Sequence, residues 1–258
     1  MLTLQWASAS DVGRVRRVNE DNLWVSERLF VVADGMGGHA AGEVASELAI
    51  AEFRRLAERP TLHTEDLTRA ISQANGQIVK TGSQRGDRFG MGTTLTGMSV
   101  VSAGGTDQWA VFNVGDSRVY RFAGDRLSQL TVDHSEVQEL VTAGQLLRED
   151  ARVHPRRNVV TRSLGSDPAP VPDVWVMPPV VGDRFLICSD GLTTELDDPD
   201  IAEVLRDVAD PQTAADELVR RANSAGGHDN ITTVVVDLIS VSIQLEGDAE
   251  QGVDGSAH

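Results

Sequence analysis

Cysteine is almost absent from this chain of 258 residues, in which Cys188 is the only one. A single thiol excludes an internal disulfide and fits a reducing cytoplasm. Cys188 follows the apolar pair Leu186-Ile187, so a small inert residue inside a strand is expected there rather than a reactive thiol.

Long hydrophobic runs are also missing. No uncharged apolar stretch reaches about 18 residues, and the N-terminal segment 1–6 has no basic region followed by an apolar core. We therefore expect no membrane span and no export signal. The expected location is the cytoplasm.

Positive charge is scarce, with 23 basic against 39 acidic residues and a net charge of -16. Such a chain repels polyanions unless a local basic patch intervenes, so no nucleic-acid partner is expected. The nearest approach to a patch is the cluster Arg14, Arg16 and Arg17. A solvated face is an equally good interpretation for Arg14 and Arg17.

No linker divides the chain. Its length and its 40% hydrophobic content suffice for one large core, so we expect a monomer with a single domain over residues 1–242. From residue 246 onward apolar side chains nearly disappear. Residues 243–258 are therefore expected to form a disordered acidic tail.

Apolar spacing predicts both helices and strands. Intervals of three and four favour helices, and short apolar runs bounded by turn residues favour strands. The predicted helices cover 43–58, 64–78, 135–143, 199–208 and 211–222, and the predicted strands cover 23–25, 29–33, 94–101, 108–114, 118–122, 127–130, 183–188 and 231–241. The four central strands follow one another closely and suggest an antiparallel meander. Helices on either side of such strands indicate an α+β layered fold.

One long excursion interrupts this order. Residues 144–158 are polar, charged and weakly patterned, and compact domains usually keep such segments for functional loops. His134 and His154 lie in or near this excursion and are expected to be loop residues.

Four short stretches place an aspartate beside a glycine or an asparagine, and three of them follow apolar runs. They are Ala33-Asp34-Gly35-Met36-Gly37-Gly38, Val114-Gly115-Asp116-Ser117-Arg118, Cys188-Ser189-Asp190-Gly191 and His228-Asp229-Asn230. A carboxylate at the end of a buried strand, next to a glycine with an accessible carbonyl, is a natural ligand for a hard divalent cation. We therefore expect a carboxylate metal centre assembled from distant parts of the chain.

These stretches, in this order and spacing, resemble the motifs of the metal-dependent PP2C-type (PPM) Ser/Thr protein phosphatases in their compact bacterial form. The resemblance runs from about residue 7 to 237 and includes the segments 11–22, 31–46, 90–94, 161–165 and 227–232. It implies a four-layer α-β-β-α sandwich, in which helices flank two antiparallel sheets. It also implies a binuclear metal site at one end and a mobile flap at about 135–160.

The resemblance also implies roles for individual residues. Asp34 would bridge two metals, the Gly35 carbonyl would complete one of them, and Asp190 and Asp229 would hold the other. Asp21 would either bind a metal directly or contact a group that does. Asp116 would contribute, with Asp190, to a third and weaker site, although a turn-forming aspartate is the alternative.

Arg16 occupies the family's phosphate-binding position, three residues before Asn19. A planar guanidinium suits that role because it binds two phosphate oxygens at once, and a surface salt bridge is the alternative. Met36 departs from the pattern of eukaryotic relatives, which have a histidine there as the proposed general acid. A thioether cannot donate a proton, so His39 or a metal-bound water is the candidate acid. The alternative is that His39 only caps the following helix or lines the site.

Oxygen ligands without His or Cys favour Mg²⁺ or Mn²⁺ over Zn²⁺. With two such ions, a bridging water would be acidified and would attack phosphoserine or phosphothreonine in line. The leading hypothesis is a protein phosphatase that opposes a bacterial Ser/Thr kinase and acts on that kinase and its substrates. The alternatives are a phosphatase of one dedicated phosphorylated regulator and a catalytically silent phosphoprotein-binding sensor.

Overall fold

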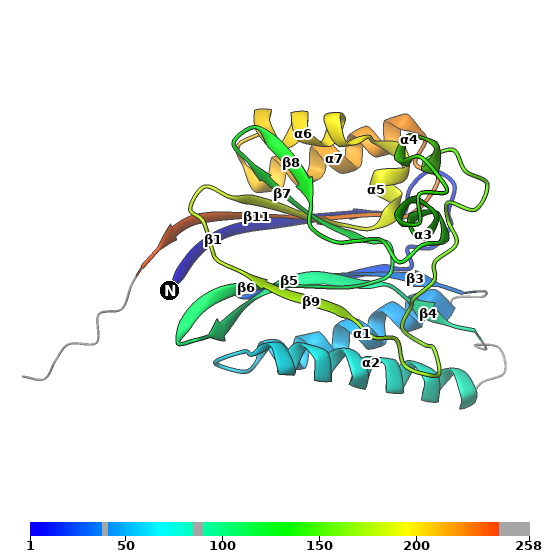
Figure 1. The fold of residues 1–258 in the computed structure, drawn as a ribbon, viewed down its shortest axis with the longest axis horizontal. Helices are drawn as coiled ribbons and strands as arrows, with labels where there is room; N and C mark the ends of the chain where they lie inside the picture. The colour runs from blue at the N-terminus through cyan, green and yellow to red at the C-terminus, as the bar shows by residue number, and fades with distance from the viewer. Residues whose placement is uncertain (38–40, 85–89, 243–258) are drawn as a thin grey trace, which may run out of the picture.

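The computed structural model describes residues 1–37, 41–84 and 90–242. Two antiparallel sheets stack face to face, and helices cover the outer face of each (Figure 1). The expected four-layer α-β-β-α sandwich is confirmed. The predicted tail, 243–258, and His39 lie outside the described residues.

The first sheet contains both ends of the described chain. Its strands, in spatial order, are β1 (Leu2–Asp11), β11 (Ile231–Val241), β10 (Arg184–Cys188), β7 (Arg118–Ala123) and β8 (Arg126–Gln129). The register pairs Ala9 with Thr233 and Cys188 with the same Thr233. The end of β10 and the beginning of β11 therefore lie at the same end of this sheet.

The second sheet follows the order β2 (Asp21–Val25), β3 (Leu29–Met36), β5 (Leu95–Ala103), β6 (Thr106–Val114) and β9 (Asp173–Met177). The two-residue strand β4 (Gly92–Thr93) pairs with the end of β3. Thr94, which was predicted to belong to one long strand, separates β4 from β5.

The prediction of a central meander is wrong. β5 and β6 pair in the second sheet, whereas β7 and β8 belong to the first. The chain changes sheets at Gly115, whose φ of +114° favours glycine and directs the chain away from β6. Since β7 pairs with β10, the meander is split between the two layers.

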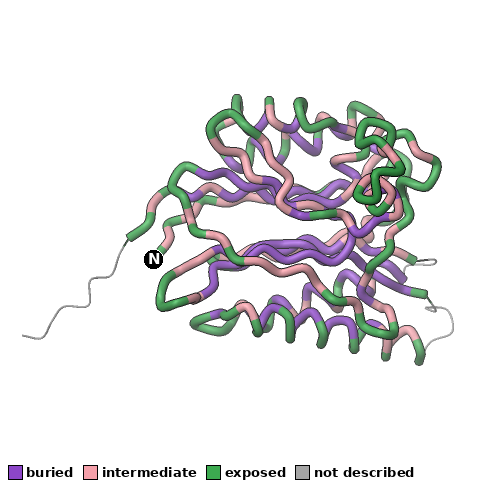
Figure 2. The backbone as a smooth tube through the Cα atoms, in the orientation of Figure 1, coloured by how far each residue is buried: buried purple, intermediate pink, exposed green. Residues whose placement is uncertain are grey.

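Three apolar clusters hold the layers together. Much of the backbone of the two sheets is buried, whereas the outer turns of the flanking helices are exposed (Figure 2). The helices α1 (Ala41–Ala57) and α2 (Thr64–Gln84) pack on the second sheet through side chains such as Phe53 and Ile71. The helices α5 (Asp190–Glu195), α6 (Asp198–Asp207) and α7 (Pro211–Ala225) pack on the first sheet. Aromatic side chains, including Trp109 and Phe185, fill the space between the sheets. None of the helices described is long and apolar enough to cross a membrane.

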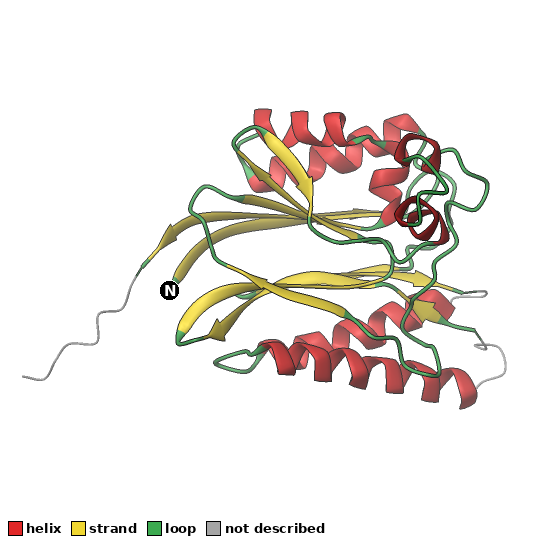
Figure 3. Cartoon of the chain, in the orientation of Figure 1, coloured by secondary structure: helices red, strands yellow, loops and turns green. Residues whose placement is uncertain are grey.

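The segment between β8 and β9 projects from one end of the sandwich (Figure 3). It contains α3 (Glu136–Thr142), which lies within the predicted helix 135–143 and is capped by Ser135, and the short helix α4 (Arg148–Ala151). Most of its side chains are exposed. The expected flap region, 135–160, therefore forms a distinct protrusion with one more helical turn than the sequence indicated.

Candidate metal centre

Asp21 and Asp34 face each other across the β2–β3 pair, as direct Cα partners. Partners in an antiparallel pair project to the same side of the sheet, so the two carboxylates are neighbours. The backbone of Asp34 is fixed by Thr94, whose Oγ1 accepts from the Asp34 N–H at 3.0 Å. Thr93 Oγ1 donates to the Asp34 carbonyl at 2.9 Å.

The first sheet contributes Asp190, the first residue of α5, and Asp229, which precedes β11. A Cβ atom on Gly191 would lie 2.0 Å from the Asn230 carbonyl oxygen, so only glycine allows these two segments to approach. Ser189 joins the two sheets, since its Oγ donates to Asp21 Oδ2 at 2.7 Å.

Gly35 is required for a similar reason. A Cβ atom there would lie 2.3 Å from the Gly42 carbonyl oxygen and 2.5 Å from that of Glu20. The N-terminal turn of α1 therefore packs directly against the chain that carries Asp34. The Asp-Gly pair identified in the sequence combines a carboxylate with a backbone position that no larger residue can occupy.

These carboxylates are removed from much of the solvent, Asp116 being buried and Asp21, Asp34 and Asp190 half-buried, and this carries an electrostatic cost. Burial, above all, raises the pKa of Asp21 to about 7 and raises the pKa of Asp34, Asp116 and Asp190. Mutual repulsion adds to this effect, because Asp190 raises the pKa of each of the other three. Carboxylates in this state are stabilised by a nearby cation.

The donor set fits hard divalent ions. The Oδ1 atom of Asp21 is buried without a hydrogen-bond partner among the described residues. Within the described ranges, no three His, Cys, Asp or Glu side chains converge as a closed ligand set. Mg²⁺ and similar ions keep several waters and need few protein ligands each, so an open arrangement suits them.

Asp116 lies at the turn that changes sheets and is buried beside Asp190. Its neighbour Gly115 donates its N–H to His134 Nδ1 at 3.1 Å. His134 was expected simply as a loop residue, but only 5% of it is exposed, and it also contacts Asp173 through Nε2. Its Nδ1 must stay unprotonated to accept from Gly115, so it helps to fix the loop that carries Asp116. His154 lies in the flap, as expected.

Arg16 is paired with a predicted metal ligand. Its Nη2 atom lies 2.7 Å from Asp229 Oδ2, and half of the side chain, 51%, is exposed. The other Asp229 oxygen accepts from the Asn230 N–H at 2.9 Å. The remaining N–H groups of Arg16 make no hydrogen bond within the described part of the chain, so they stay available for an anion.

Asn230 is a residue whose importance sequence reasoning missed. Its Oδ1 accepts from the Glu20 N–H at 2.8 Å, and its Nδ2 donates to the carbonyls of Val12 (2.9 Å) and Val18 (3.0 Å). These bonds fix both ends of the loop that carries Arg16. Asn230 was singled out only as the neighbour of Asp229, and its partners lie more than 200 residues away in the sequence.

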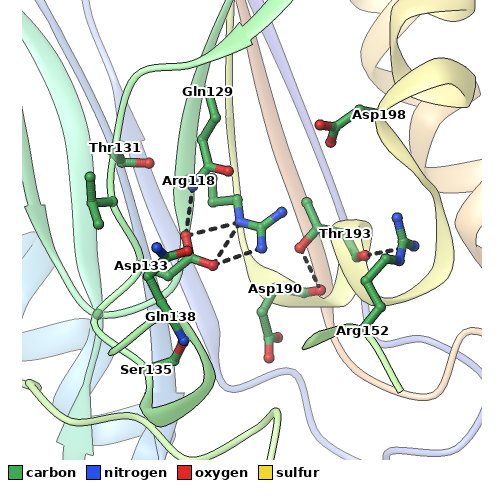
Figure 4. A network of polar contacts seen from close by, with 12 residues as sticks. Arg118, Gln129, Thr131, Asp133, Ser135, Gln138, Arg152, Asp190, Thr193 and Asp198 are labelled. Atoms are coloured by element: carbon green, nitrogen blue, oxygen red, sulfur yellow. Dashed lines mark hydrogen bonds and ion pairs between the residues drawn. The ribbon is translucent and has the colours of Figure 1, made fainter. Parts of the chain in front are cut away.

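A hollow of about 310 Å³ adjoins Asp116 and Asp190. Figure 4 shows its inner part, where Arg118 and Asp133 lie on one side and Asp190, Thr193 and Asp198 on the other. The flap forms the outer wall. Cys188 lies behind this region, fully buried, and burial raises the pKa of its thiol to about 12, in keeping with an inert role.

The chain matches known phosphatases over most of its length. Residues 16–223 fit the family model described as protein phosphatase 2C. A serine/threonine phosphatase, stp, from Listeria innocua is 40% identical over 239 residues, which cover 88% of this chain and 93% of that protein. The serine/threonine protein phosphatase PstP of Mycobacterium tuberculosis is 38% identical over 240 residues, which cover 92% of this chain and 46% of PstP.

Solved structures agree with these matches. A crystal structure of the M. tuberculosis phosphatase PstP/Ppp has a TM-score of 0.86 at 38% identity and covers 92% of this chain and 99% of that one. The catalytic domain of PstP in complex with two manganese ions has a TM-score of 0.85 at 36% identity, covering 93% and 100%. From its sequence and its fold alike, the chain belongs to the protein phosphatase 2C family.

Proposed function

We propose that this chain hydrolyses phosphoserine and phosphothreonine in proteins and depends on divalent metal. The observation that carries the proposal is the clustering of four aspartates, one buried and three half-buried, which come from both sheets and raise one another's pKa values at the end of the sandwich where Arg16 lies. Family membership and the names of the relatives support the same reaction.

Two divalent ions would be held by Asp34, the Gly35 carbonyl, Asp190 and Asp229, with Asp21 behind or beside them. When bound, such ions neutralise phosphoryl oxygens and acidify water. The protein fixes the ligands in advance: Thr94 holds the backbone of Asp34, and Ser189 holds the Asp21 carboxylate. Asp116 lies beside Asp190, and the two would contribute to a third, weaker metal site.

Arg16 would bind the phosphoryl group of the substrate. It is half-exposed at the metal centre, its loop is clamped by Asn230, and only Nη2 is engaged, with Asp229. A charged, planar donor of this kind stabilises the negative charge that the reaction concentrates on phosphoryl oxygens. His39 remains a candidate general acid by sequence position alone.

The substrates would be phosphoproteins, among them a cognate Ser/Thr kinase and its targets, and the active form would be a monomer. Mn²⁺ and Mg²⁺ both suit the oxygen ligands. A silent phosphoprotein-binding module is disfavoured, since such a protein has no need to hold four mutually repelling carboxylates together, partly shielded from water.

The experiment is hydrolysis of p-nitrophenyl phosphate and of a phosphothreonine peptide, with Mn²⁺, with Mg²⁺ and with chelator. Both substrates should be hydrolysed with either metal and neither with chelator, and Asp34→Asn should be inactive under every condition. Binding of the phosphopeptide without hydrolysis would favour the silent module instead.

A further inference from the structure

The hollow beside Asp116 and Asp190 is lined by arginines of the flap. Arg148, Arg152 and Arg157 form its outer wall, and Asp197 and Asp198, at the start of α6, face them. The hollow is continuous with the proposed metal centre because two of its lining residues, Asp116 and Asp190, belong to that centre. A substrate held at the metals can therefore extend into it.

The arrangement of α4 directs positive charge into the hollow. Ala151 and Arg152 follow Arg148 by three and four positions, so they lie on the same face of the helical turn as Arg148. All three residues line the hollow. Glu149 and Asp150, between them, are not among its lining residues. Helical geometry thus separates the cations of this short segment from its anions.

These cations are not neutralised by carboxylates. Among the described residues, Arg152 donates only to the carbonyl oxygens of Leu196 (3.2 Å) and Thr193 (3.4 Å), and Figure 4 shows its contact with Thr193. Within the part of the chain that the structure describes, Arg148 and Arg157 form no ion pair. By contrast, Arg156 of the same segment pairs with Glu136 at 2.6 Å.

The carboxylates of the opposite wall already have partners. Asp197 caps α6 by accepting from the Asp200 N–H at 3.0 Å, and Asp198 accepts from the Tyr120 hydroxyl at 3.3 Å. Deeper in the hollow, Asp133 binds Arg118 through both oxygens, at 2.7 and 3.0 Å. Asp197 and Asp198 thus each accept a hydrogen bond from an uncharged donor, whereas the three flap arginines have no carboxylate partner within the described ranges.

We propose that this hollow is a subsite for an anionic side chain of the substrate, a carboxylate or a second phosphate, that flanks the phosphoresidue under attack. The proposal rests on the proposed phosphatase function and specifies its substrate class as acidic or multiply phosphorylated segments. A hollow of about 310 Å³ is large enough for one such side chain. Arg148 and Arg157 would bind the anion, while Arg152 holds the flap against α5.

The test compares four phosphothreonine peptides that differ at one flanking position, which carries glutamine, glutamate, lysine or a non-hydrolysable phosphonate analogue of phosphothreonine. The kcat/KM of each is measured for the wild type, for the double variant Arg148→Ala/Arg157→Ala and for Arg156→Ala. Arg156 is the matched control, because it lies in the same segment but is neutralised by Glu136.

We expect the wild type to favour the glutamate and phosphonate peptides over the glutamine peptide by about tenfold, the effect of one charge-assisted contact. The double variant should lose this preference and keep its activity on p-nitrophenyl phosphate, whereas Arg156→Ala should retain the preference. A larger gain in kcat/KM for the phosphonate peptide than for the glutamate peptide would identify the anion as a second phosphate. Equal gains would identify a subsite that accepts either anion.

Equal kcat/KM values for all four peptides in the wild type would overturn the proposal. A preference for the lysine peptide would also overturn it, because Asp197 and Asp198 would then bind a cationic side chain in the hollow. An anion preference that survives in the double variant would also overturn it. Failure to hydrolyse p-nitrophenyl phosphate and the glutamine peptide would refute the phosphatase function itself, so the two failures are distinguishable.

Discussion

Arg16 and Asp229 form an ion pair at 2.7 Å, although one is predicted to bind phosphate and the other metal. The contact joins a loop near the N-terminus to the segment before β11, 213 residues away. The Asp229 carboxylate would contact a metal on one side and Arg16 on the other. A phosphate bound by Arg16 would therefore lie next to a ligand of the metal centre. Substitutions at Arg16 should therefore affect both phosphate binding and metal binding.

Arg16→Ala should raise KM for p-nitrophenyl phosphate and weaken inhibition by free phosphate. Loss of a charge-assisted contact is worth about 1.5–3 kcal/mol, or roughly 10-fold to 150-fold in kcat/KM. Metal affinity should rise slightly, because Asp229 is freed from a competing cation. Steady-state kinetics and calorimetry measure these effects. Arg17→Ala, at an exposed position of the same loop, is the control, and a normal KM in Arg16→Ala would reduce Arg16 to a surface salt bridge.

Asn230→Ala should destabilise the protein and loosen the Arg16 loop. The substitution leaves the Glu20 N–H and the carbonyls of Val12 and Val18 without partners, at a cost of about 1–3 kcal/mol for each group that stays buried. Urea unfolding should show the loss in stability, and KM should rise more than kcat falls. Asn223→Ala, which removes a single side-chain bond to Asp11, should cost far less. Equal losses in the two variants would contradict the clamp.

Asp190→Asn should weaken Mn²⁺ binding by at least about 100-fold, because a neutral amide replaces a charged oxygen ligand. In chelator, the same variant should melt no lower than the wild type, since one of several repelling buried charges is gone. Calorimetry and thermal melts with and without Mn²⁺ test both statements. Asp207→Asn, at an exposed position of α6, should leave both properties unchanged. Unaltered metal binding in Asp190→Asn would remove Asp190 from the site.

The metal-free protein should lose stability as pH rises from about 4 through about 7. Burial and neighbouring charges raise the pKa of Asp21 to about 7 from an ordinary value of 3.8, so in this window the folded state binds more protons than the unfolded state. The melting temperature in chelator should therefore be higher at about pH 5.5 than at about pH 7.5. Mn²⁺ should reduce the difference, and Asp21→Asn should flatten it. A melting temperature in chelator that increases over this range would contradict the proposed repulsion.

The local pattern of apolar and turn residues was sufficient to predict many of the helices and strands. The helices α6 and α7 each have an aspartate N-cap, a proline in the first turn and regular apolar spacing, so their positions were predicted to within about three residues. The strands β1 and β9 were missed because both lie at sheet edges and are only partly buried, which weakens their apolar pattern. The change of sheet after β6 was missed because strand partners are set by distant residues, as in the pairing of Arg118 with Cys188.

The residues of the site likewise divide into those that local pattern predicts and those that only the fold brings together. Asp34, Asp190 and Asp229 stood out because an aspartate at a strand end beside glycine or asparagine is a local pattern with a chemical meaning. The pairing of Arg16 with Asp229, the clamp formed by Asn230 and the buried position of His134 depend on segments that meet only in the folded chain. No local pattern encodes them.

The most direct measurement of the central claim is turnover of a phosphothreonine peptide by one protein sample before chelation, after removal of all metal, and after Mn²⁺ is restored. Turnover should disappear with the metal, return with Mn²⁺, and be unaffected by a thiol-alkylating reagent, because Cys188 is buried and the function depends on carboxylates. Undiminished turnover in the metal-free sample would show that the buried aspartates do not form a catalytic metal centre.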